Sequence, residues 1–173
     1  MQPEDALGIV AQVAVTLAGF AGVVVVFRPE AVHRWSQLDR FRLRLLLDNS
    51  ILPLGYALVA MLLLTIKPHP ESIWRWCSGF TLLFQVTGAI GNIKMARSLD
   101  AADLASVNRR LFVPFIGFGA VMFVLQAWNT AILNAFWPFF AAIVAHLIAA
   151  IMQFARIVLI QPHSEVGDGN PKA

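Results

Sequence analysis

Long apolar runs separated by short polar connections are the feature that most constrains how this chain folds. A bilayer's hydrocarbon core is about 30 Å thick, so a helix rising 1.5 Å per residue needs about 20 apolar residues to cross it. Five segments meet or approach this length, and charged residues make up only 13% of the chain. These features predict an all-α integral membrane protein, a five-transmembrane-helix bundle. The predicted spans are residues 6–27, 43–66, 73–93, 111–128 and 137–160.

The division between the last two spans follows from length. The apolar stretch from Leu111 to Ile160 contains 50 residues, which is too many for one crossing. Asn129, Thr130 and Asn134 favour a turn within it, and Trp137–Pro138 is typical of an interfacial aromatic followed by a proline at the first position of a helix. We therefore expect a single bundle over residues 1–160 and a flexible cytoplasmic tail over residues 161–173, where apolar periodicity ends.

The distribution of lysine and arginine predicts the orientation. Eleven of the 13 lie in the first and third connections or around the end of the last span, and only Lys67 and Arg75 lie on the other side. The positive-inside rule then places the N-terminus outside and the C-terminus in the cytoplasm. Glu4 and Asp5 occupy the place where a signal peptide carries positive charge, so we expect the first segment to be retained as a span.

Two capping signals predict that the second and fourth spans begin as helices before they enter lipid. They are SQLD (Ser36–Asp39) and SLDAAD (Ser98–Asp103), each of which precedes arginines and an apolar run. Serine or aspartate at such a position accepts hydrogen bonds from the first free backbone N–H groups of a helix.

A polar cluster, Asp48-Asn49-Ser50, interrupts the second span. Pro53 lacks an N–H, so the carbonyl of Asn49 loses its usual helical partner in a region where unpaired polar groups are costly. One interpretation is a kinked, partly hydrated helix whose oxygens hold a cation or a proton. The alternative is structural: an ion pair from Asp48 to Arg44, one turn earlier, or to Arg156 at a similar depth in the fifth span.

His146 is the second polar feature, because it lies near the middle of the fifth span. An intramembrane histidine suggests a proton relay or a ligand, whereas the structural alternative is an interhelical hydrogen bond worth about 0.6 kcal/mol. Gln153 and Arg156 follow it along one side of the helix, and the third span offers polar residues at central and cytoplasmic depths. The predicted transport path or polar cluster is His146, Asp48, Asn49, Ser50, Gln85, Asn92, Gln153 and Arg156.

Small residues predict close helix packing. Ala18 and Gly22 form a ridge on the first span, and Ala14 extends it by a turn. Gly88 and Gly91 on the third span are candidates to receive it. Such faces permit contact within one chain or between subunits, and the sequence leaves both open.

Several functions are disfavoured by what the sequence lacks. It has no nucleophile elbow, paired-carboxylate site, HExxH motif or glycine-rich phosphate loop, so we expect no enzymatic activity. Its histidines and single cysteine lack metal-ligand spacing, so no metal or other cofactor is expected. The arginines flank apolar segments instead of forming a basic patch, which argues against nucleic acid.

Two functions remain. The first is a homo-oligomeric transport protein, an ion channel or pore for a cation or proton lined by the second and fifth spans. The second is a non-catalytic accessory or assembly subunit of a larger membrane complex. The pattern resembles small bacterial inner-membrane proteins in a general way, which implies a multi-pass protein of the plasma membrane in contact with lipid.

Overall fold

The computed structural model describes residues 2–27, 35–68, 70–98 and 109–159. These residues are helical apart from short connections, and no strand occurs among them. The all-α class predicted from the sequence is therefore confirmed. The elements are α1 (Pro3–Phe27), α2 (Gln37–Leu64), α3 (Ile73–Ala96), α5 (Arg109–Trp128), the π-helical turn η2 (Asn129–Leu133) and α6 (Phe136–Leu159).

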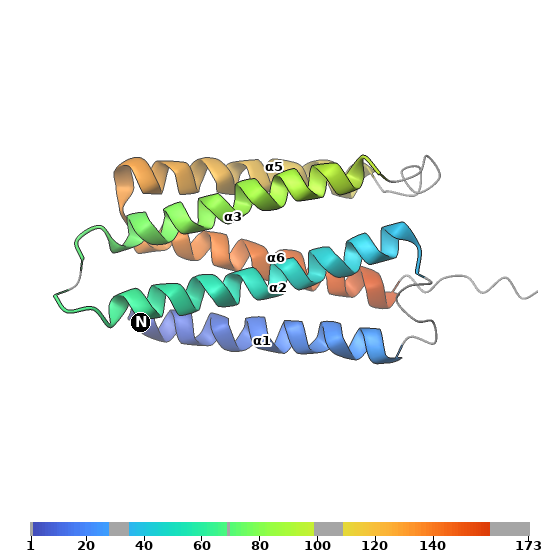
Figure 1. Cartoon of the computed structure of the whole chain (residues 1–173), viewed down its shortest axis with the longest axis horizontal. Helices are drawn as coiled ribbons and strands as arrows, with labels where there is room; N and C mark the ends of the chain where they lie inside the picture. Colours follow the sequence, from blue (N-terminus) through green and yellow to red (C-terminus); the bar gives the residue numbers. More distant parts are fainter. Residues whose placement is uncertain (1, 28–34, 69, 99–108, 160–173) are drawn as a thin grey trace, which may run out of the picture.

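The helices lie side by side along a common axis (Figure 1). Helices α2 and α6 lie centrally, with α1 on one side and α3 and α5 on the other. Successive long helices run in opposite directions, so the described connections alternate between the two ends of the bundle. The predicted tail, residues 161–173, lies outside the described residues, as does most of the second capping signal.

Four helical segments within the described ranges are long and apolar enough to cross a membrane. They are Pro3–Phe27, Gln37–Leu64, Ile116–Leu133 and Phe136–Val158. The chain thus has the helices of a multi-pass membrane protein. Helix α3, which contains the predicted third span, is absent from this group. Charged and polar residues lower its mean hydropathy, among them Arg75, Gln85 and Lys94.

Ser36 caps α2, as the first capping signal predicts. Its Oγ accepts a hydrogen bond from the backbone N–H of Asp39 at 3.0 Å. The helix consequently begins at Gln37, before the apolar segment that starts at residue 43.

Alanines bring the three helices α1, α2 and α6 close together. Small side chains allow backbones to approach, and this packing compensates for the weak hydrophobic drive between helices in lipid. Larger side chains such as Leu46, Phe139 and Ile143 fill the remaining space. The fully buried alanines are Ala14 and Ala21 of α1, Ala57 and Ala60 of α2, and Ala142 and Ala150 of α6.

Asn129 organises the turn between α5 and α6. Its Oδ1 accepts from the backbone N–H of Ala135 at 2.9 Å, and its Nδ2 donates to the carbonyl of Ala135 at 3.0 Å. The same Nδ2 lies 2.6 Å from Oγ of Ser78 in α3. Asn129 is fully buried, so these bonds replace contacts that its amide would otherwise make with water.

Asn134 completes the turn. It adopts the left-handed conformation, with φ 48° and ψ 47°, which asparagine tolerates better than most residues. Its Oδ1 accepts from the backbone N–H of Arg75 at 2.9 Å, and its Nδ2 donates to the carbonyl of Glu71. Helix α6 begins at Phe136, so Pro138 is its third residue and not, as predicted, its first.

We expect Asn129→Ala to lower the free energy of unfolding by about 1–3 kcal/mol, because it leaves buried partners unsatisfied. Ser78→Ala removes only one of these bonds and is expected to cost less, about 0.6 kcal/mol. The measurement is the unfolding midpoint of the purified protein in detergent. Equal effects of the two substitutions would contradict the role assigned to Asn129.

Candidate functional site at the seam between α2 and α6

His146 lies near the middle of α6 and contacts α2. Its Nδ1 is 2.8 Å from Oδ1 of Asn49. The two residues are 97 positions apart in the sequence, and the His146 ring is only half-buried. The structure therefore brings together two of the predicted site residues, one from each of the two spans expected to line a path.

Asn49 is held from within its own helix. Its Nδ2 donates to the carbonyl of Leu45 at 2.7 Å. Pro53, one turn further along, has no N–H to offer the Asn49 carbonyl. The neighbouring Ser50 is fully buried, and its Oγ donates to the carbonyl of Leu46 at 2.8 Å. Side chains of this turn thus bond to the backbone of the preceding turn, and Asn49 Oδ1 is left to face His146.

Tyr56 forms the second contact of the His146 ring. The two ring centroids are 5.7 Å apart, with an interplanar angle of 61°. Phe80 and Phe84 of α3 also approach Tyr56 edge to face, at 6.1 and 6.3 Å. The Tyr56 hydroxyl is buried and has no hydrogen-bond partner within the described ranges. The Tyr56 ring therefore contacts both His146 of α6 and the two phenylalanines of α3.

Asp48 does not join this contact. Its Oδ2 lies 3.5 Å from Nε of Arg44, and the side chains are 45% and 53% exposed, respectively. Arg44 also approaches α3, with Nη1 3.7 Å from Sδ of Met95. Of the two partners that the sequence suggested for Asp48, the structure pairs it with Arg44. An exposed pair of this kind contributes about 0–1 kcal/mol in water.

The other predicted path residues form no hydrogen bond with Asn49 or His146 in the described part of the chain. Gln153 of α6 is 4% exposed, and its Oε1 is buried without a partner in the described part of the chain. The same holds for Oε1 of Gln85 and for Nη2 of Arg156, whose side chains are half-buried. Asn92 is half-buried in α3. No hydrogen bond recorded among the described residues links these four side chains to His146.

None of the four predicted packing residues is fully buried. Gly22 is exposed and Gly88 half-buried, and an added Cβ at either position would meet nothing within 4 Å. Ala18 is half-buried on α1. At Gly91 a Cβ would lie 3.5 Å from Nη2 of Arg44, so this glycine accommodates the Arg44 side chain.

A second polar cluster, formed by Ser78, Gln126 and Asn129, was not predicted as a site. Gln126 is fully buried, and its Nε2 donates to the carbonyl of Pro138 at 2.6 Å, while its Oε1 has no partner among the described residues. The only signal in the sequence was a glutamine three residues before the asparagine of the expected turn. The cluster joins α3, α5 and α6.

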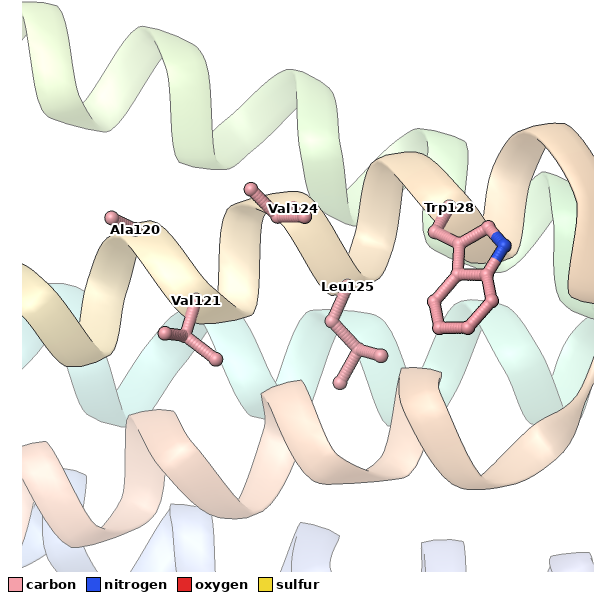
Figure 2. Close-up of a pocket in the computed structure, with 5 residues that line it drawn as sticks. All are labelled: Ala120, Val121, Val124, Leu125 and Trp128. Carbon is pink, nitrogen blue, oxygen red and sulfur yellow. The ribbon is translucent and has the colours of Figure 1, made fainter.

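Two surface grooves lie outside the contact between Asn49 and His146. One runs along α5 and is lined by apolar side chains, with Val121, Leu125 and Trp128 directed toward α6 (Figure 2). The other lies beside α1 and includes Gln12, Thr16 and Leu54. Neither groove is lined by His146 or Asn49, so neither leads to their contact.

The arrangement suits the transfer of a proton better than the binding of a metal. An imidazole accepts and donates protons near neutral pH, and an amide oxygen can orient it. Within residues 2–27, 35–68, 70–98 and 109–159, no three His, Cys, Asp or Glu side chains gather where they could hold a metal ion. No protein-family model matches the chain, and no curated protein or solved structure gives a significant match.

Proposed function

We propose that the protein is a homo-oligomeric transport protein of the plasma membrane that moves a proton or another cation along the seam between α2 and α6. The observation that carries this proposal is the 2.8 Å contact between His146 Nδ1 and Asn49 Oδ1 near the centre of both helices. An ionisable group at this depth is expensive in hydrocarbon, and ion and proton pathways are among the functions that such groups mark.

Further polar atoms support a path along α6. Gln153 and Arg156 follow His146 toward the C-terminal end of this helix, and both have a buried polar atom without a partner in the described part of the chain. Such atoms can bond with a passing proton carrier at little reorganisation cost. The outward-facing Gly22 and Gly88 leave open space where a second copy could approach closely.

The proposal includes five spans, with the N-terminus outside and the C-terminus in the cytoplasm. Helices α2 and α5 are both apolar enough to span, and α2 ends at the opposite end of the bundle from the start of α5 (Figure 1). The connecting helix α3 has 24 residues, or about 36 Å at 1.5 Å per residue. It therefore has the length to cross with its neighbours, and its polar residues Ser78 and Thr81 are fully buried.

An accessory or assembly subunit is the second candidate. Helix α5 is the least buried of the four candidate spans, with 11% of its most apolar window buried against 44% for α6. Its apolar groove in Figure 2 offers a face for a helix of another chain. This function predicts that the purified protein moves no ion and co-purifies with another membrane protein.

Flux through the purified protein tests the transport proposal. We expect proteoliposomes to dissipate a proton or potassium gradient, and we expect His146→Ala to reduce this flux to the level of protein-free vesicles. Gln12→Leu, which removes an exposed amide on α1 far from the seam, is the matched control. The mass of the oligomer in detergent should be unchanged in both variants. Wild-type flux from His146→Ala would remove the proposed path.

Reporter fusions test the topology. A reporter fused after Ala173 should be cytoplasmic, whereas one fused at Asn129 should lie outside, because four crossings would precede it. A cytoplasmic signal at Asn129 would contradict the five-span arrangement without affecting the flux measurement.

A further inference from the structure

The contact between Asn49 and His146 determines which nitrogen of the ring carries hydrogen. A neutral imidazole has one N–H and one lone pair, and the hydrogen bond at one nitrogen fixes the role of the other. The ring's recorded hydrogen bond is at Nδ1, 2.8 Å from Asn49 Oδ1.

The orientation of the Asn49 amide follows from its other bond. Asn49 Nδ2 lies 2.7 Å from the carbonyl of Leu45, which can only accept a hydrogen bond. The atom facing Leu45 is therefore the NH₂ group, and the atom facing His146 is the amide oxygen. Because an amide oxygen also can only accept, His146 Nδ1 is the donor. The neutral ring then has its lone pair at Nε2.

The groups around the ring favour a proton over a metal cation. The nearest carboxylate in sequence to Asn49, Asp48, is paired with Arg44. Tyr56 is the titratable residue that contacts the ring, and a buried phenol is a poor ligand for a hard cation. A single imidazole nitrogen falls short of the ligands that a metal ion needs, whereas one lone pair is enough for a proton.

Other titratable groups on the packed helices are few and lie toward helix ends or away from the ring. Helix α1 has them only in its first turn, and α5 has none between residues 111 and 128. The remaining groups on α3 and α6 are Arg75, Cys77, Lys94 and Arg156.

We propose that the ion taken up at the seam is a proton, that it binds at Nε2 of His146, and that Asn49 is the positioning residue that holds the ring in the Nδ1–H form. The uptake of a proton rests on the proposed transport function, whereas the Nδ1–H form of His146 follows from the hydrogen bonds of Asn49 alone.

Nitrogen-15 NMR of the full chain in lipid vesicles tests this inference. The other three histidines are replaced by glutamine, so that a single labelled imidazole remains. At high pH we expect Nδ1 to give the signal of a protonated nitrogen and Nε2 that of an unprotonated one. Lowering the pH should convert the Nε2 signal to the protonated type. An Nε2–H form at high pH, or an Nε2 that never titrates while the protein stays folded, would overturn the proposal.

Substitution of Asn49 supplies the second measurement. Asn49→Leu removes the acceptor, so a second set of signals from the Nε2–H form should appear; Gln12→Leu should leave the spectrum unchanged. An unaltered spectrum in Asn49→Leu would exclude the positioning role.

Flux separates this inference from the function on which it rests. A His146-dependent potassium flux without proton flux would overturn the proton assignment and leave the transport function intact. A His146-dependent proton flux supports both.

Discussion

The structure depends on one constraint: hydrocarbon offers no hydrogen bonds, so a polar group inside the bundle costs free energy unless another part of the protein bonds to it. The two central helices meet this requirement at their contact, where Asn49 of α2 bonds to its own helix and to His146 of α6. The turn between α5 and α6 meets it through Asn129, which bonds to Ala135 and to Ser78 of α3. These asparagines provide the principal polar links between helices that otherwise meet through alanines and aromatic rings.

Much of the fold could be predicted because its causes are local. Apolar length indicates helices of membrane type, and Ser36 shows where α2 begins. The packing of the helices against one another could not be predicted from such local signals. Along the predicted ridge of α1, Ala14 is fully buried, Ala18 is half-buried and Gly22 is exposed, whereas Ala21, which was not predicted to pack, is fully buried. Small residues occur on more than one face of α1, so the sequence pattern does not select the face that packs.

Only part of the candidate site could be predicted, because the sequence does not determine how each helix is rotated. Depth in the membrane can be counted along the sequence, and it placed His146 near the midplane and the cluster that contains Asn49 closer to the cytoplasmic end. The contact between Asn49 and His146 was therefore not predicted. The direction in which each side chain points depends on helix rotation, which the count does not give. Asp48 precedes Asn49 immediately, yet it pairs with Arg44 on a more exposed face. Gln126 was not predicted as a site residue, because its partner is the backbone carbonyl of Pro138 and side-chain patterns in the sequence do not indicate backbone partners.

The coupling free energy between Asn49 and His146 tests the central claim most directly. It is obtained from the unfolding free energies of Asn49→Leu, His146→Leu and the double variant, measured in the same detergent. If the two side chains bond across the seam, the coupling should be about 0.6–1.7 kcal/mol, which spans the average and the maximum found for hydrogen bonds between membrane helices. Additive effects, with a coupling near zero, would show that α2 and α6 are not joined at this point.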